Sequence, residues 1–172
     1  MKHAVYGLSR AMSWIGALVL VLLAAMSVIS IAGRALSGLG LGPVPGDFEL
    51  VEAGTALAVF CFLPWAHLRR GHAVVDLFWR AYPAPLRRML EVLSDALMAL
   101  VWWLLVWRMG VAMLDYRDNA EVTFILQFPV WWGYAASMVP AVIGCGVYLW
   151  RLLETLGLVT PPEDFASAEA VH

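Results

Sequence analysis

His67, His72 and Asp76 are the side chains of this sequence that come closest to a metal-binding set. Two histidines five positions apart on a helix point in different directions, whereas helical zinc sites use a spacing of four. No second His or Cys pair accompanies them, and the other histidines, His3 and His172, lie near the chain ends. We therefore predict no metal site and no cofactor, and we interpret His67 and His72 as polar residues at a membrane surface.

The cysteines and serines do not form a recognisable catalytic set. Cys61 and Cys145 lie in separate apolar runs and lack the Cys-x-x-Cys spacing of thiol–disulfide exchange proteins. The sequence contains no Gly-x-Ser-x-Gly nucleophile motif. A haem held between membrane helices needs histidines at mid-depth, and the apolar runs carry none there. These observations argue against an enzyme.

Charged residues stand at the ends of the long apolar runs. Arg34 follows the first run, and Glu49 and Glu52 begin the second. Because it is costly to remove an ion from water, Arg34 is expected to face a carboxylate across the intervening Gly/Pro-rich turn. The centres of the runs are apolar, whereas the core of a transporter places a polar site near the bilayer midplane. We interpret these charges as structural.

The composition is that of an integral membrane protein. Hydrophobic residues make up 62% of the 172 residues and charged residues 14%, compared with about 45–50% and 25% in soluble domains. The mean hydropathy is +0.78. The formal net charge is −2, and no basic run exceeds two residues, which argues against a nucleic-acid partner.

Four segments are long enough to cross the membrane, which takes about 20 apolar residues for ~30 Å of hydrocarbon. They predict one all-α, four-helix transmembrane domain, residues 1–157, with helices at about 11–33, 49–68, 89–114 and 130–150. The first segment exceeds the apolar core of a signal peptide, so we interpret it as a retained anchor. Pro64 and Pro140 are expected to interrupt the hydrogen-bond ladders of their helices.

Basic residues predict the orientation. They are frequent before the first segment, between the second and third, and after the fourth, namely Lys2, Arg10, Arg69, Arg70, Arg80, Arg87, Arg88 and Arg151. The other two loops hold only Arg34, Arg108 and Arg117. The positive-inside rule therefore places both termini in the cytoplasm.

Two segments outside the spans have their own patterns. Arg69, His72, Asp76 and Arg80 recur at intervals of three or four, which predicts an amphipathic helix at about 70–82 in the cytoplasmic interface. Residues 158–172 are polar and are expected to form a disordered cytoplasmic tail.

Small residues recur every four positions along the fourth segment, at Gly133, Ser137, Ala141 and Cys145. Such a stripe allows helices to approach closely, either within the chain or against a partner protein. Four helices without a polar midplane site are few to line a transport path. We therefore predict an accessory subunit that supports a larger membrane partner.

Three stretches occur in a characteristic order. Residues 46–52 open the second segment, residues 69–76 read Arg-Arg-Gly-His-Ala-Val-Val-Asp, and Pro129-Val130-Trp131-Trp132 precedes the fourth segment. Over about residues 10–155, this order resembles the small, DctQ-type membrane subunit of tripartite ATP-independent periplasmic (TRAP) transporters.

The resemblance implies a partner-dependent role in the bacterial inner membrane. The partners would be a large membrane subunit, which carries the substrate and sodium sites and moves as an elevator, and a periplasmic solute-binding protein. The small subunit would serve as a scaffold in contact with membrane phospholipids. Uptake would be driven by ion gradients, and the solute would be a carboxylate such as a C4-dicarboxylate or sialic acid.

Carried over by position, the resemblance implies structural and interface roles. Glu49 and Glu52 both fit the family glutamate, which together with Arg34 would stabilise the outer ends of the first two helices. The positions that would set the corner into the interfacial helix and the start of the fourth helix are Gly71, His72, Asp76, Pro129 and Trp132.

Two other interpretations stay open at the level of the sequence. One is an adaptor or assembly subunit of an unrelated membrane complex. The other is a four-span membrane enzyme that would use His67, His72 and Asp76 on lipid head groups.

Overall fold

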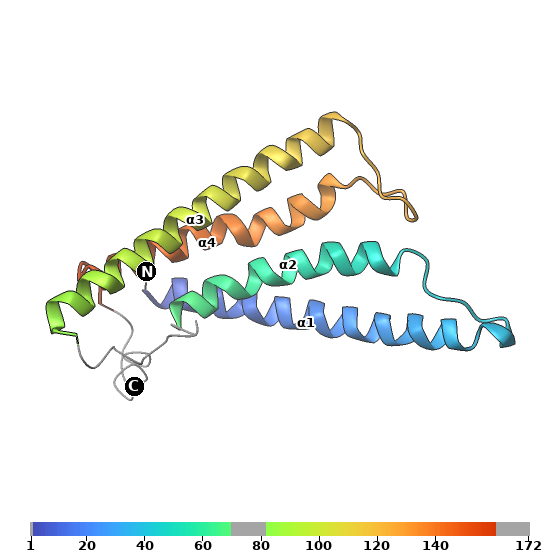
Figure 1. The fold of residues 1–172 in the computed structure, drawn as a ribbon, viewed down its shortest axis with the longest axis horizontal. Helices are drawn as coiled ribbons and strands as arrows, with labels where there is room; N and C mark the ends of the chain where they lie inside the picture. The colour runs from blue at the N-terminus through green and yellow to red at the C-terminus, as the bar shows by residue number, and fades with distance from the viewer. Residues whose placement is uncertain (1, 70–81, 161–172) are drawn as a thin grey trace.

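A computed structural model of the chain describes residues 2–69 and 82–160. These residues contain the helices α1 (Lys2–Ala35), α2 (Asp47–Leu68), α3 (Ala84–Asp118) and α4 (Trp131–Thr155), and a short 3₁₀ turn, η1 (Ser37–Leu39) (Figure 1). Each of the four α-helices is long and apolar enough to cross a membrane. The predicted all-α fold with four spans is confirmed.

The helices continue past the apolar runs that predicted them. α3 is the longest, and its 35 residues extend about 52 Å at 1.5 Å per residue, compared with ~30 Å for the hydrocarbon layer. Hydropathy marks the part of a helix that lies in hydrocarbon, whereas the helix itself ends where the backbone changes conformation. α3 begins directly after Pro83, and Ala120, with a φ of 51°, follows its end.

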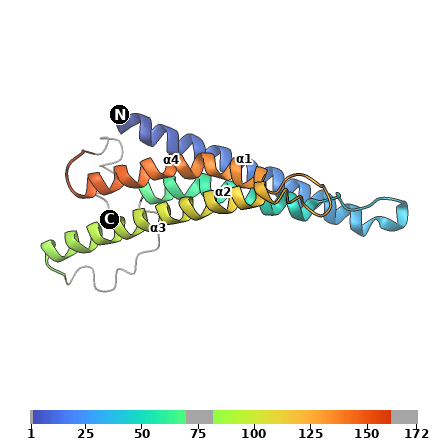
Figure 2. The ribbon, with the colours of Figure 1, turned by 90° about the horizontal axis from the view of Figure 1, so that it is seen from above.

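The helices form two antiparallel hairpins, α1–α2 and α3–α4, and α2 packs against α4 to join them. The hairpins lie together at the end that holds the start of α1 and the end of α4, here called the closed end (Figure 1). They separate toward the end that holds the α1–α2 turn and the α3–α4 loop, here called the open end. The view from above shows α4 between α1 and α3 (Figure 2).

The core follows α4, the most buried helix. In the most apolar stretch of α4, 39% of the residues are buried, whereas in the most apolar stretch of α3 only 6% of the residues are buried. Trp102 of α3 packs on Ala141 and Tyr148 of α4, and its indole N–H donates a hydrogen bond to the carbonyl of Ala141 (3.0 Å). This contact requires a glycine at position 144, because a Cβ there would come within 2.5 Å of the indole.

Most large apolar side chains of α1 and α3 face outward, and α2 and α4 expose some of theirs. Examples exposed by at least half are Trp14, Leu18, Val28, Leu100, Trp103, Trp107 and Val139. In water such a surface would be strongly unfavourable, whereas lipid chains or another membrane protein can cover it. The chain therefore presents an apolar perimeter around a thin core.

Candidate functional site

The turn between α1 and α2 is held by a polar cluster around Asp47. The guanidinium of Arg34 lies 3.7 Å from the Asp47 carboxylate, Ser30 donates a hydrogen bond to the same carboxylate, and the N–H of Val44 donates to Ser30. Arg34 thus faces a carboxylate across the Gly/Pro-rich turn, and that carboxylate is Asp47 rather than Glu49 or Glu52. Because the arginine is 67% exposed, the ion pair itself contributes at most about 1 kcal/mol.

Glu49 binds the α3–α4 loop. Its two carboxylate oxygens accept hydrogen bonds from the backbone N–H groups of Ile125 (2.6 Å) and Leu126 (3.0 Å). The Leu126 side chain covers Gly46, whose φ of 72° suits a glycine. The first turn of α2 is thereby attached to a loop of the other hairpin, at the end where the hairpins separate.

Pro129 and Trp132 lie at the start of α4, where the loop closes into the helix. The N–H of Thr123 donates to the carbonyl of Phe128 (2.9 Å), and the N–H of Trp132 donates to the carbonyl of Pro129 (3.0 Å). Trp132 is 55% exposed and packs edge-on against Trp131. The two residues therefore occupy a loop-to-helix junction, with the Trp132 ring on the outer surface.

The small-residue stripe of α4 lies inside the chain. Ser137 and Ala141 are buried, and Gly133 and Cys145 are partly buried. A Cβ at Gly133 would lie 3.4 Å from the Cβ of Ala53 of α2, so the stripe brings α4 close to α2 toward the open end. The sequence left open whether the stripe packs within the chain or against a partner protein, and the observed geometry is that of packing within the chain.

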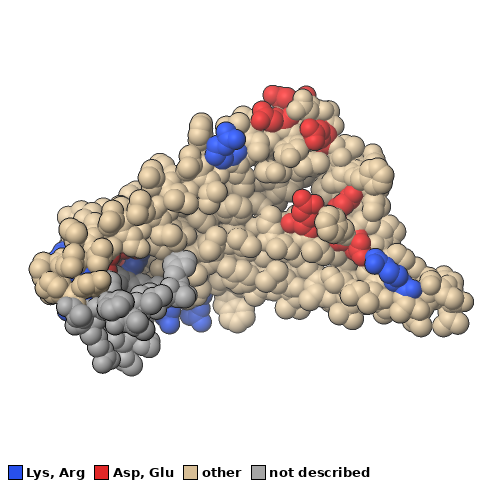
Figure 3. Space-filling view, viewed as in Figure 1, with Lys and Arg blue, Asp and Glu red and all other residues tan. Residues whose placement is uncertain are grey.

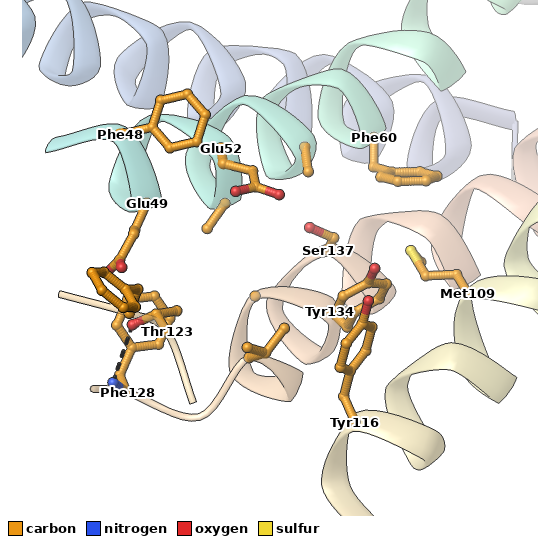
Figure 4. A pocket seen from close by; sticks show the side chains of 15 residues that line it. Phe48, Glu49, Glu52, Phe60, Met109, Tyr116, Thr123, Phe128, Tyr134 and Ser137 are labelled. Carbon is orange, nitrogen blue, oxygen red and sulfur yellow. Dashed lines mark hydrogen bonds between the residues drawn. The ribbon is translucent and has the colours of Figure 1, made fainter. Parts of the chain in front are cut away.

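Between the two hairpins at the open end lies a cavity of about 520 Å³. Its wall is mostly apolar and aromatic and includes Phe48, Phe60, Met109, Phe124 and Phe128 (Figure 4). The polar side chains of its wall are Glu49, Glu52, Tyr116, Thr123, Tyr134 and Ser137. The space-filling view shows this hollow between the two arms, with acidic side chains on both of them (Figure 3).

Glu52 differs from Glu49 in its contacts. No hydrogen bond or ion pair to the Glu52 carboxylate occurs among residues 2–69 and 82–160, and the residue is exposed. Figure 4 shows its carboxylate directed into the space between α2 and α4. The two glutamates that both fit the family position are thus distinct: Glu49 is used within the chain, and Glu52 faces the cavity.

A buried ionic cluster at the closed end was not anticipated from the sequence. The Glu154 carboxylate accepts hydrogen bonds from the Tyr6 hydroxyl (3.0 Å), the Trp150 indole (2.7 Å) and the Arg151 guanidinium (3.0 Å). The side chains of Arg151 and Glu154 are 3% and 2% exposed. The signal in the sequence is the Arg151–Glu154 pair at i,i+3 after an apolar run, but the sequence does not reveal that Tyr6 meets it.

His67 is also buried inside the closed end. It is 4% exposed, and its ring stacks on Tyr148 at 4.2 Å, which in turn stacks on Trp102 at 4.7 Å. Its Nε2 lies 3.8 Å from the carboxylate of Asp95, which accepts a hydrogen bond from Thr155 (2.5 Å). The interpretation of His67 as a polar residue on a surface helix is therefore wrong as to exposure, because packing on α4 buries the last turn of α2.

Gly71, His72 and Asp76, with most of the predicted interfacial helix at 70–82, lie outside the described residues, as does the tail from 161 onward. Within the described part of the chain, no three His, Cys, Asp or Glu side chains are grouped so that they could hold a metal ion. The polar residues that the structure does describe mainly hold the chain's own helices together.

The fold and these contacts define a four-helix integral membrane protein whose polar clusters brace its two ends. Residues 23–158 match the family model described as "Tripartite ATP-independent periplasmic transporters, DctQ component". The chain belongs to this family, and it is the small membrane subunit of a TRAP transporter. No curated protein and no solved structure matches the chain.

Proposed function

We propose that this chain is a static scaffold for the large membrane subunit of the transporter. The large subunit would move as an elevator during sodium-coupled uptake of a carboxylate, which a periplasmic solute-binding protein would deliver. Membership of the DctQ family supports the proposal that the chain works with these two partner proteins. The sodium coupling and the carboxylate come from the resemblance described above.

The apolar perimeter of the four helices carries the proposal. Trp14 of α1 and Leu100 of α3 are exposed by 68% and 65%, which is the arrangement expected of a surface covered by lipid and by another membrane protein. The buried cluster at Glu154 and the loop contact at Glu49 brace this perimeter at its two ends. A wide, braced apolar belt resists being carried along by a moving neighbour, which is what a scaffold requires.

Charge supports a cytoplasmic location of the closed end in the bacterial inner membrane. The described basic residues there include Arg10, Arg69, Arg87, Arg88 and Arg151, whereas many acidic residues gather at the open end (Figure 3). The positive-inside rule assigns the basic side to the cytoplasm. Both chain ends would then be cytoplasmic, and the cavity would lie toward the periplasm.

The test is co-purification combined with reconstituted uptake. The chain carrying an affinity tag is expressed together with the large subunit and extracted in mild detergent, and the complex is placed in liposomes with the solute-binding protein. We expect the large subunit to be recovered with the tag, and uptake of a carboxylate to require both membrane subunits and an inward sodium gradient.

Each part of the proposal has its own contrary result. Uptake by the large subunit alone at the same rate would contradict the scaffold role. Uptake by this chain alone would contradict the expectation that it has no transport path of its own. Uptake that is unchanged when sodium is replaced by potassium would contradict the sodium coupling and leave the scaffold role in place.

A further inference from the structure

The cavity at the open end contains a buried polar group that the chain itself does not satisfy. Ser137 is 2% exposed, and its hydroxyl oxygen has no hydrogen-bond partner among the described residues. Figure 4 shows that oxygen directed toward the side of the cavity from which Glu52 projects. A buried hydroxyl without a partner is unfavourable, so this position indicates an occupant that forms a hydrogen bond with it.

The charge of the cavity wall indicates the charge of the group that can bind in it. Among the described residues, the wall contains the carboxylates of Glu49 and Glu52 and no Lys, Arg or His. Glu49 is already used by two backbone N–H groups of the loop, so Glu52 is the carboxylate available to a ligand. An anionic group is disfavoured here, and a phospholipid would bring a phosphate for which the wall offers no cation.

The shape of the cavity and the aromatic rings of its wall further restrict which kind of ligand can bind there. Tyr116 and Tyr134 lie with ring centroids 5.1 Å apart on the α3–α4 side, opposite Glu52 of α2 (Figure 4). Aromatic faces attract cations, and a Lys or Arg side chain has an apolar stem that packs against residues such as Phe60 and Met109. A bare metal ion would instead need several oxygen ligands, whereas most of this wall is hydrocarbon.

We propose that the cavity receives a Lys or Arg side chain from an apolar transmembrane helix of the large membrane subunit. The cation pairs with Glu52 and donates a hydrogen bond to Ser137, and its stem lies on the aromatic wall. The inference rests on the proposed function, because the scaffold role supplies the partner helix. It adds the place of contact and the charge that the partner must present.

Two kinds of variant test the cavity by co-purification of the large subunit. Glu52→Lys reverses the charge, and Ala56→Trp fills the cavity from an exposed position in its wall. The matched controls are Asp118→Lys, an exposed acid at the end of α3, and Thr55→Trp, an exposed neighbour outside the wall. We expect each cavity variant to lower recovery of the large subunit about tenfold or more, and each control to change it less than twofold.

Charge-swap rescue is the decisive arm of the experiment. Each Lys and Arg near the outer end of a large-subunit helix is changed to Glu, and one such change is expected to restore recovery with Glu52→Lys. Thermal unfolding of each purified variant shows that the chain itself is folded. Recovery equal to wild type for both Glu52→Lys and Ala56→Trp would overturn the cavity proposal.

The remaining outcomes also separate the alternatives. If Glu52→Lys abolishes a phospholipid seen by native mass spectrometry, and no charge swap restores binding, the occupant is a lipid and the proposal fails. If the wild-type chain does not retain the large subunit at all, it is the proposed function that fails.

Discussion

Removing the carboxylate of Glu154 tests whether the closed end is held by its buried ionic cluster. In Glu154→Leu, the Arg151 guanidinium loses a carboxylate at 3.0 Å, and Tyr6 and Trp150 lose their acceptor. Breaking a buried ion pair by removing one partner costs about 3–5 kcal/mol. At 2–4 °C per kcal/mol for a chain of this size, the midpoint of thermal unfolding is expected to fall by roughly 6–20 °C.

The assay is far-UV circular dichroism during heating of the purified chain in detergent micelles. The matched control is Glu121→Leu, which removes an exposed glutamate in the α3–α4 loop and is expected to lower the midpoint by only a degree or two. The double variant Arg151→Leu, Glu154→Leu is expected to be more stable than Glu154→Leu alone, because it removes both charges of the Arg151–Glu154 pair. Equal midpoints for Glu154→Leu and Glu121→Leu would refute the reasoning.

Two further predictions concern helix packing and orientation. Gly144→Ala places a methyl group against the indole of α3 and is expected to lower the thermal midpoint by several degrees, corresponding to about 1–3 kcal/mol. At Gly146, no described residue lies within 4 Å of an added methyl group, so Gly146→Ala should leave the midpoint unchanged or raise it. The same loss of stability in both variants would contradict the close α3–α4 contact. A cysteine at Ser37, in the α1–α2 turn, is expected to react with a membrane-impermeant maleimide in intact cells, whereas a cysteine at Thr160 should react only after lysis. The opposite labelling pattern would reverse the proposed orientation.

The sequence determined the helices and their number, because crossing hydrocarbon imposes a local requirement. A run of about 20 apolar residues must satisfy its own backbone hydrogen bonds, and a helix does so without help from the rest of the chain. Hydropathy placed the starts of the second and third helices at about 49 and 89, whereas the helices begin earlier, directly after Gly46 and Pro83.

Which side chains are inside was decided by tertiary structure. Trp102 is buried and its neighbour Trp103 is 53% exposed, although both lie in the same apolar run. In a membrane protein both sides of a helix are apolar, so hydrophobic periodicity does not distinguish the face on α4 from the face on lipid. The stripe along Gly133 and Ser137 marks a packing face, but only the fold shows that α2 covers it.

Contacts between distant parts of the chain were likewise settled by the fold. The partner of Arg34 is Asp47, chosen by the path of the turn, and Tyr6 meets Glu154 across 148 residues of sequence. Glu49 and Glu52 look equivalent in the sequence, yet one binds a loop of the other hairpin and the other faces a cavity. The sequence by itself therefore determined the number of spans and their apolar centres, since these depend on local hydropathy, whereas α1, α3 and α4 extend beyond the predicted ends. Which side chains pair with each other and which are buried depend on how the two hairpins pack, and only the tertiary structure shows that packing.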